Sequence, residues 1–393
     1  MTIATHIATF LEKSSWIRKM FEEGARLKQI HGNENVFDFS LGNPYMQPPQ
    51  RFNDRLREMA AAGQNGAHAY MPNPGYPGVR QSVAAYLSRE HETAITENEI
   101  LMTCGAAGGL NVILKAILEP GDEVITPAPY FVEYRFYADN HGGTLNAVPT
   151  HRDFTLDMAA IEAAVTEKTK AVLINSPNNP TGQVYAAEEL NALGELLSRK
   201  SREIGRTIYL LSDEPYRKIV YDGIQVPSIF SAYPDSLIAT SYSKDLSIPG
   251  ERIGFVAINP ATPYKDDLAS AMALANRILG FVNAPAFMQR VVEGLQGESV
   301  DISHYARKRE LLCNGLKACG YDFVKPPGTF YLFPRSPIAD DVKFVQALQE
   351  ELILAVPGSG FGGPGHIRLA FCVDDQTISD AMPGFEKAIK KFQ

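Results

Sequence analysis

Residues 236–259 read SLIATSYSKDLSIPGERIGFVAIN, in which two apolar runs enclose a polar segment. Both runs are short and bounded by turn residues, so we expect two β-strands with the polar segment at a strand end. The segment offers small hydroxyls, an amine and a guanidinium, at Ser241, Ser243, Lys244 and Arg252. Hydroxyls and an arginine suit a phosphate, and a lysine held among them suits an imine. Read alone, however, the segment is more typical of a polar turn whose lysine and arginine are solvated.

The central part of the chain repeats this alternation of apolar runs and helical segments. Further runs with strand character are Ile100–Thr103, Glu123–Thr126, Ala171–Asn175 and Thr207–Leu211. Several of them lack polar alternation, which is typical of parallel strands covered on both faces. Helical spacing at 110–118, 157–165 and 187–203 separates some of the runs. The pattern predicts an α/β fold with a mainly parallel sheet, helices on both faces and functional residues at the carboxyl ends of strands.

The flanks of this region predict a second, smaller unit. At 393 residues the chain is long enough for two domains. Residues 262–297 are expected to form long helical stretches that link the two. Residues 300–393 alternate helical and strand-like segments, which is typical of an α+β domain. The first 35 residues are expected to be helical and amphipathic.

Composition excludes several classes of function. The net charge is −8 and there is no long basic run, so nucleic acid is not an expected partner. No apolar stretch reaches the roughly 18–20 residues of a membrane span, and the N-terminus lacks the pattern of a signal peptide. The four cysteines show no Cys-x-x-Cys spacing and the histidines no His-x-x-x-His pair, so nothing argues for a metal site. We therefore expect a cytoplasmic enzyme.

Three other loops follow predicted strands and carry candidate binding residues. The run 105–109 is glycine-rich, follows a strand and opens a helix, where backbone N–H groups attract a phosphate. It has neither the Gly-Lys-Ser/Thr of a Walker loop nor the glycine order of a dinucleotide fold. Asn179 lies between two prolines that restrict its loop, and Asp213 precedes Tyr216 by three residues after another strand. Taken alone, each of these loops is at least as typical of a tight structural turn.

Together the four strand ends describe one ligand. A phosphate site, a lysine for an imine and a buried carboxylate suit a pyridine aldehyde with a phosphate arm. In such a site the carboxylate keeps the ring nitrogen protonated, so that the ring accepts electrons from the substrate. The expected cofactor is therefore pyridoxal 5'-phosphate.

In this order the motifs resemble those of fold-type I aminotransferases of the class I/II family, which are aspartate aminotransferase-like, over nearly the whole chain. The matching motifs are Pro-Asn-Asn-Pro-Thr-Gly, Asp-Glu-Pro-Tyr, Ser-x-Ser-Lys followed after seven residues by Arg, and a late Arg-Leu. The resemblance implies that Lys244 forms the imine and moves the proton, and that Asp213 pairs with the ring nitrogen. Tyr216 and Asn179 would hydrogen-bond the 3-oxygen of the ring, and Phe131 would stack on its face. The phosphate would be held by Gly105, Ala106, Ala107, Ser241, Ser243 and Arg252.

The same resemblance implies where the substrate carboxylate binds. Arg368 matches the arginine that clamps the α-carboxylate, with Asn179 beside it, and Gly42 matches the glycine whose backbone also meets it. The alternation of residues 367–371 leaves Arg368 on the strand face opposite to its apolar neighbours. The two ends of the chain would therefore meet in the small domain.

Domain bounds and assembly follow from this resemblance as well. The small domain would consist of an N-terminal segment, residues 1–48, and a C-terminal part, residues 286–393. The large cofactor-binding domain would span residues 49–285. Tyr70 matches a tyrosine that reaches the phosphate of the neighbouring subunit, which implies a homodimer with shared active sites.

The residue that recognises the substrate side chain stays open. Family members that act on aspartate place a cation opposite the distal carboxylate, and one subgroup has a lysine where this chain has Ala107. Arg18 or Lys19 could supply that charge, although a solvated helix face explains both residues as well. An apolar or aromatic pocket is the other possibility, and core packing explains its candidates equally well: Trp16, Ile17 and Tyr331.

The resemblance implies an aminotransferase that acts on small-molecule amino acids and 2-oxo acids. We expect a ping-pong reaction between an L-amino acid and a 2-oxo acid such as 2-oxoglutarate, with aspartate as the first candidate donor and aromatic or broad specificity next. A β-elimination lyase or a 1-aminocyclopropane-1-carboxylate synthase-like enzyme is the alternative, because such enzymes share the motifs around the ring. A non-catalytic sensor with this fold is a more distant alternative.

Overall fold

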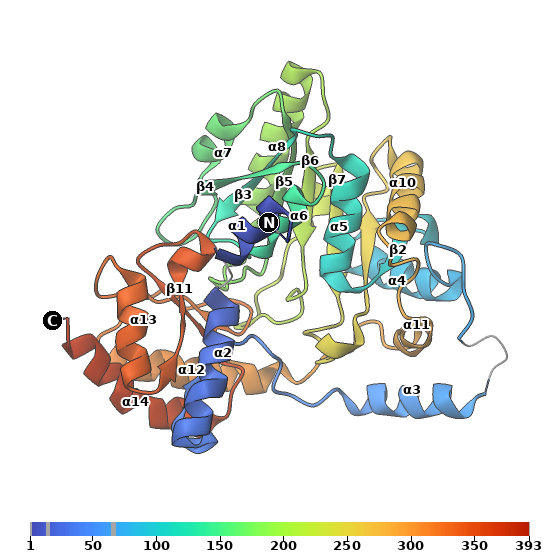
Figure 1. Ribbon diagram of the computed structural model, residues 1–393. Helices are drawn as coiled ribbons and strands as arrows, with labels where there is room; N and C mark the ends of the chain where they lie inside the picture. The colour runs from blue at the N-terminus through green and yellow to red at the C-terminus, as the bar shows by residue number, and fades with distance from the viewer. Residues whose placement is uncertain (1, 13–15, 64–67, 393) are drawn as a thin grey trace.

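The computed structural model describes residues 2–12, 16–63 and 68–392. Figure 1 shows a large part built around one central sheet and a smaller part in which the blue α2 lies beside the orange and red helices near the C-terminus. Within the described ranges, no helix is long and apolar enough to cross a membrane. The arrangement confirms the predicted α/β fold, and the site described below involves residues of both parts.

The central sheet has seven strands in the order β2-β8-β7-β6-β5-β3-β4. Their bounds are β2 Ile100–Thr103, β3 Glu123–Ala128, β4 Thr144–Pro149, β5 Thr169–Asn175, β6 Tyr209–Asp213, β7 Ser236–Ser241 and β8 Gly254–Ile258. β8 is antiparallel to its neighbours β2 and β7, whereas the other pairs are parallel. The carboxyl ends of the parallel strands therefore share one sheet edge with the beginning of β8. The sequence pattern does not predict β4, which lies at the border of the sheet with most of its residues partly or fully exposed.

Helices cover both faces of this sheet. They are α3 Gln50–Ala61, α4 Pro77–Glu90, α5 Gly105–Ile117, α6 Glu133–Asp139, α7 Met158–Ala164, α8 Ala187–Ile204, α9 Ile229–Ala232, α10 Lys265–Ile278 and α11 Ala286–Glu293. Along β5, Ala171 and Leu173 pack with α5, α6 and α10, whereas Val172 and Ile174 pack with α4, α8 and α11. All four side chains are fully buried, which explains why this strand shows no polar alternation.

One expectation about the helices is wrong in its limits. α5 begins at Gly105 and not at Leu110, so the glycine-rich run forms the first turn of the helix. Residues 262–297 form two helices, α10 and α11, which agrees with the helical stretches expected there. Gly280, with φ of +89°, follows the end of α10, and Pro285 precedes α11, so both ends carry ordinary helix-boundary residues.

The smaller part combines segments from near both ends of the chain. Its elements are α2 Trp16–His31, β1 Phe37–Asp38, α12 Ile302–Ala318, β9 Tyr331–Leu332, α13 Asp341–Glu350, β10 Ile353–Leu354, β11 Val356–Pro357, β12 Ile367–Ala370 and α14 Asp375–Lys390. The first helix, α1 Thr5–Glu12, lies instead beside α6 of the large part, where Phe10 packs edge-to-face on Phe136 with 4.8 Å between the ring centroids (Figure 1). β1 pairs with β10, and β12 lies between β11 and β9. Phe39 N donates to Leu354 O at 2.9 Å, and Phe39 O accepts from Ala370 N at 2.8 Å. These bonds join a segment near residue 40 to strands formed more than 300 residues later.

The packing of α11 bears on where the two parts divide. α11 packs against α3 and α4, and its Val291 and Val292 belong to the same core as residues of the central sheet. The division into residues 1–48, 49–285 and 286–393 stays a prediction. The position of α11 favours a boundary several residues after 285.

Candidate active site

A cavity of about 300 Å³ opens where β5, β6 and β7 end and α5 begins. Twelve residues predicted from the sequence line this cavity: Gly42, Ala106, Ala107, Phe131, Asn179, Asp213, Tyr216, Ser241, Ser243, Lys244, Arg252 and Arg368. Most of them follow strands of the central sheet, whereas Gly42 and Arg368 come from the two ends of the chain. The structure thus brings these separate motifs together in one place.

One end of the cavity is suited to an anion. Because α5 begins at Gly105, the free N–H groups of its first turn lie at the cavity wall. Gly105 has φ of +73°, and a Cβ at this position would come within 2.8 Å of Arg252 Nη2. Glycine therefore lets the guanidinium lie against the beginning of the helix. The same end is lined by the buried Ser241 and Ser243.

Arg252 reaches this end of the cavity because of the antiparallel β8. Gly254, near the beginning of that strand, pairs with Ser241 on one side and with Thr103 on the other. Arg252 itself has φ of +52°, a left-handed conformation that costs a non-glycine residue about 1–2 kcal/mol. Its Nη1 donates to Pro249 O at 2.9 Å, which holds the side chain near the turn that precedes β8.

Asp213 is the last residue of β6, two residues beyond the predicted end of that strand. Tyr134 Oη donates to Asp213 Oδ2 at 2.5 Å, whereas Oδ1 is buried and has no partner in the described part of the chain. Burial raises the pKa of Asp213 to about 7, although the bond from Tyr134 acts in the opposite direction. A buried carboxylate oxygen without a partner is costly, so Oδ1 marks a place for a cationic N–H group of a ligand.

Three asparagines at the end of β5 have different roles. Asn175 is the last residue of the strand, and Asn178 and Asn179 lie in the loop that follows it. Asn178 Oδ1 accepts hydrogen bonds from Thr181 N and Oγ1 at 3.1 and 2.9 Å, so Asn178 closes the turn. Asn179 is left to line the cavity, and its N donates to Asn175 Oδ1 at 2.6 Å. Asn175 Nδ2 in turn donates to Asp213 O at 2.7 Å. The amides therefore fix the end of β5 against the end of β6.

Lys244 lies in the loop after β7, at the centre of the cavity-lining set. Its Nζ donates to Gly42 O at 2.9 Å, which joins the loop to the N-terminal segment. Burial lowers the pKa of Lys244 to about 8, and the nearby positive charge of Arg368 adds to the effect. A substantial fraction of the amine is therefore neutral near pH 8, where it can act as a nucleophile or a base.

Aromatic side chains form much of the remaining wall. Tyr216 Oη and Tyr331 Oη lie 3.0 Å apart, and both residues line the cavity. Burial raises the pKa of Tyr216 well above its ordinary value, so this residue stays a phenol that can donate a hydrogen bond. Phe131 packs edge-to-face against Tyr134, with 5.6 Å between the ring centroids, which orients its ring at the cavity.

Arg368 provides a buried cation at the opposite end from Arg252. Its Nη1 donates to Asn179 Oδ1 at 3.1 Å and its Nη2 to Ser40 O at 2.6 Å. The guanidinium carbon lies 4.6 Å from the ring centroid of Tyr331, and the side chain is only 2% exposed. The Nε atom is buried and has no hydrogen-bond partner among the described residues. A carboxylate would satisfy both this N–H group and the charge.

Some residues of the site were not identified from the sequence. Tyr134 lies inside α6, in an aromatic-rich segment where no local pattern distinguishes it from a core residue. Asn175 ends an apolar run and so reads as part of a strand. Ser40 contributes only its backbone carbonyl to Arg368, which side-chain reasoning does not detect.

The remaining predicted residues lie off the wall of the cavity or outside the described part. Gly105 lies behind Arg252, and Tyr70 is 90% exposed and does not line the cavity of its own chain. The contact of Tyr70 with a neighbouring subunit therefore stays a prediction. The backbone of α2 includes residues 17–19, but the side chains of Ile17, Arg18 and Lys19 lie outside the described part.

The residues present fit pyridoxal 5'-phosphate. The unpartnered Oδ1 of Asp213 suits a protonated ring nitrogen, and the beginning of α5 with Arg252 suits a phosphate. Lys244 offers an amine of lowered pKa to an aldehyde. In the described ranges, no group of three or more His, Cys, Asp or Glu side chains is arranged to hold a metal ion.

Comparison with known proteins agrees with this chemistry. Residues 34–383 match the model of the family "Aminotransferase class I and II". A probable aspartate/prephenate aminotransferase of Aquifex aeolicus is 33% identical over 93% of this chain and 94% of its own length. An aspartate/prephenate aminotransferase of Thermus thermophilus is 31% identical over 89% of this chain and 90% of its own.

Solved structures give the same result. An aminotransferase from Eubacterium rectale is 40% identical and superposes with a TM-score of 0.97 over all of both chains. An aspartate aminotransferase from Thermus thermophilus with maleate is 28% identical, with a TM-score of 0.88 over 99% of this chain and 100% of that one. The chain therefore belongs to the class I and II aminotransferases, enzymes that depend on pyridoxal 5'-phosphate.

Proposed function

We propose that this aminotransferase moves the amino group of L-aspartate to 2-oxoglutarate in a ping-pong cycle. The observation that carries the proposal is the presence of Lys244 and Arg368 in one cavity. A lysine amine of lowered pKa suits proton transfer at a substrate Cα, and a buried guanidinium suits a carboxylate. An α-amino acid carries its amine and its carboxylate on the same carbon, so one substrate can engage both residues.

The side chains divide the work of this reaction. When bound, pyridoxal 5'-phosphate supplies an aldehyde for the amino group and a ring that withdraws electrons from the substrate. Lys244 takes the proton from Cα and returns it, Asp213 Oδ1 holds a proton at the ring nitrogen, and Tyr216 donates a hydrogen bond from its phenol. Arg368 holds the α-carboxylate in place while the proton moves.

The choice of aspartate is supported by the names of several relatives, which are given as aspartate or aspartate/prephenate aminotransferases, some of them as probable ones. The described lining of the cavity offers three cations, Lys244, Arg252 and Arg368, and the mechanism uses all of them. The distal carboxylate of aspartate therefore needs a further charge. Arg18 and Lys19, near the beginning of α2, are the candidates that we propose.

We further propose that two copies of the chain share their active sites. Support comes from Tyr70, whose side chain is 90% exposed in the single chain although it is a large aromatic residue. In the proposed homodimer this tyrosine reaches the phosphate end of the neighbouring cavity. The cytoplasmic location stays a prediction.

A substrate panel tests the proposal. Purified enzyme is supplied with aspartate, alanine, phenylalanine, tyrosine and a thioether amino acid, each with 2-oxoglutarate, pyruvate or prephenate as acceptor. We expect the highest kcat/KM for aspartate and parallel double-reciprocal lines, as a ping-pong cycle requires.

Two results would overturn the proposal. A kcat/KM for phenylalanine or tyrosine about tenfold above that for aspartate would make aromatic amino acids the substrates. Release of pyruvate and ammonia from the thioether amino acid, with no acceptor added, would make the enzyme a β-elimination lyase.

A further inference from the structure

The turn that follows β6 has two faces. Asp213 and Tyr216 line the active-site cavity, whereas Glu214 and Arg217 line a separate cavity of about 40 Å³ behind it. Adjacent residues of a strand point to opposite faces, so the change of side between Asp213 and Glu214 continues the alternation of β6. Asp213 and Tyr216 are thus each followed directly by a charged residue, Glu214 and Arg217, on the side of the turn that faces away from the active site. We call this side the hidden face of the turn.

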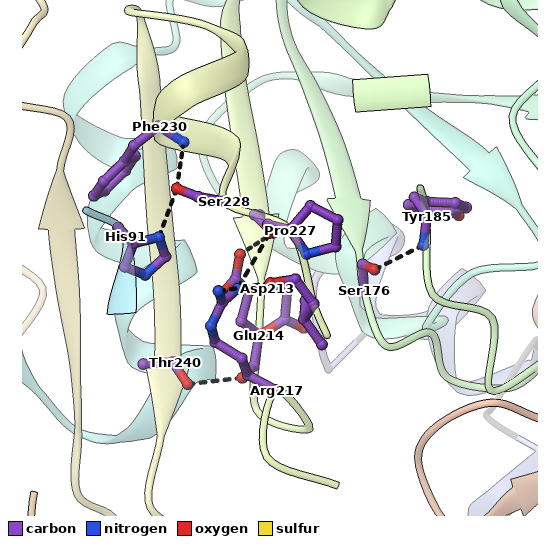
Figure 2. A network of polar contacts seen from close by, with 12 residues as sticks. His91, Ser176, Tyr185, Asp213, Glu214, Arg217, Pro227, Ser228, Phe230 and Thr240 are labelled. Carbon is purple, nitrogen blue, oxygen red and sulfur yellow. Dashed lines mark hydrogen bonds and ion pairs between the residues drawn. The ribbon is translucent and has the colours of Figure 1, made fainter. Parts of the chain in front are cut away.

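The two hidden residues form an ion pair. Arg217 Nη1 donates to Glu214 Oε2 at 3.0 Å, and Ser212 Oγ donates to Glu214 Oε1 at 2.8 Å. The side chain of Glu214 is 2% exposed and that of Arg217 is 14% exposed. Figure 2 draws the pair together with Asp213 and the segments that it contacts. Such burial makes each charge costly without the other.

The same pair ties the turn to neighbouring segments. Arg217 Nη2 donates to Val226 O at 2.8 Å. Thr240 Oγ1 donates to Glu214 O, and Glu214 N donates to Ala239 O, both at 2.9 Å (Figure 2 shows the first of these two bonds). The backbone of Glu214 is therefore bound to the end of β7, and its carboxylate is bound through Arg217 to the loop before α9.

The other titratable groups on the hidden face are neutral or paired with each other. The Glu214–Arg217 pair is therefore the main source of charge near Asp213 on this side. His91 is 3% exposed, and burial lowers the pKa of His91 to about 3, so the ring is neutral. Lys218 and Asp245, which line the same small cavity, are engaged with each other at 3.1 Å. Each buried carboxylate of the hidden face therefore has its own cation.

We propose that Glu214 and Arg217 are positioning residues that hold Asp213 and Tyr216 in place and keep the charge behind Asp213 balanced. The inference rests on the role proposed above for Asp213. The negative charge of Glu214 is one of the influences that raise the pKa of Asp213, after burial itself. Loss of Arg217 leaves the buried Glu214 without its cation, so that this carboxyl takes up a proton and no charge remains behind Asp213. Loss of Glu214 leaves the positive charge of Arg217 unbalanced, which lowers the pKa of Asp213.

The other groups around Asp213 stay the same in this comparison. They are Tyr134 and Tyr137 of α6, Tyr216 of the turn, and the cavity-lining Lys244, Arg252 and Arg368. A difference in the pH midpoint of cofactor binding between these variants therefore comes from Glu214 and Arg217.

The test measures the dissociation constant of pyridoxal 5'-phosphate between pH 5.5 and 9 for the full-length protein. The variants are Arg217→Met, Glu214→Gln and the double variant Glu214→Gln/Arg217→Met. We expect the midpoint of the pH dependence to fall by about one unit in Glu214→Gln, where Arg217 keeps its charge, and to change little in Arg217→Met, where Glu214 becomes protonated. The double variant, which has no charge on the hidden face of the turn, is expected to lie close to the wild type. Ionisations of the cofactor itself are common to all variants.

Arg206→Met is the matched control. Arg206 pairs with Asp122 at 2.5 Å. It lies just before the beginning of β6, whereas Glu214 and Arg217 follow the end of that strand. This variant is expected to lower the melting temperature without moving the pH midpoint. If Arg217→Met does not fold, Glu214→Gln and the double variant still give opposite predictions, a lowered midpoint and an unchanged one.

Equal weakening of cofactor binding at every pH in both single variants would show that the pair is only structural, and would overturn the inference. The variant Asp213→Asn separates this failure from a failure of the proposed function. If Asp213→Asn leaves the affinity and its pH dependence unchanged, the role of Asp213 itself is wrong. If Asp213→Asn abolishes the pH dependence while the pair variants do not shift it, only the inference about Glu214 and Arg217 is wrong.

Discussion

The two ends of the active-site cavity are assembled in different ways. The cofactor end is made by the beginning of α5 and the ends of β6 and β7, all within the central sheet and its helices. The carboxylate end depends on Arg368, which donates to a carbonyl 328 residues away, at Ser40. Cofactor binding is thus a property of one sheet edge, whereas substrate binding requires the two ends of the chain to meet. Mutations should therefore separate the two functions.

Lys244→Ala gives the largest expected effect on turnover. The variant loses the group that moves the proton, so kcat is expected to fall by about 10³-fold or more. The phosphate and ring contacts come from other residues, so pyridoxal 5'-phosphate is still expected to bind. Steady-state kinetics and a cofactor titration measure the two quantities. Full activity in this variant would contradict the proposed mechanism.

Arg368→Gln should damage only the carboxylate end. The loss of a charge-assisted bond is expected to lower kcat/KM by about 10- to 100-fold, mainly through KM, with unchanged affinity for the cofactor. Arg335→Gln is the control, because Arg335 is about half exposed and lies 4.0 Å from Asp322 in a weak surface pair. A large loss of cofactor affinity in Arg368→Gln would mean that the two ends are not separable.

Tyr134→Phe should affect the cofactor end in a pH-dependent way. The hydrogen bond from Tyr134 lowers the pKa of Asp213, so its removal raises that pKa and leaves more of the carboxyl protonated at neutral pH. Affinity for pyridoxal 5'-phosphate is expected to fall about tenfold near pH 6.5 and to recover as the pH rises above 8. A loss that is the same at pH 6.5 and pH 9 would argue against this charge effect.

The smallest expected effect concerns the substrate side chain. Arg18→Ala and Lys19→Ala are each expected to raise KM about threefold for dicarboxylic substrates, because a single ion pair typically contributes less than about 1 kcal/mol. KM for phenylalanine or tyrosine serves as the internal control and should not change. An equal rise for all amino acids would remove both residues from the recognition of the distal carboxylate.

Much of the cofactor end was predictable from the sequence, and the reason is local. Lys244, Asp213 and Asn179 each follow an apolar run directly, and parallel strands bring such positions to one sheet edge. The mainly parallel sheet was predictable for the same reason, since the buried strands are continuous apolar runs.

What the sequence did not reveal depends on contacts between distant segments. Tyr134 becomes important only because α6 packs across the end of β6 and brings its hydroxyl to Asp213. The strand β4 has mostly exposed residues at the border of the sheet, so its pattern carries little signal. The true beginning of α5 was missed because glycines disfavour helices, although Gly105 is required there by the approach of Arg252.

The hydrogen bonds of Phe39 to Leu354 and Ala370 have a consequence for synthesis of the protein in the cell. A ribosome adds about 5–20 residues per second, so the 328 residues between Ser40 and Arg368 take roughly 15–65 s to translate. During that interval the nascent segment around Phe39 lacks its strand partners Leu354 and Ala370, while the central sheet can already form. A chain stalled before residue 350 would therefore contain a cofactor end without a substrate end.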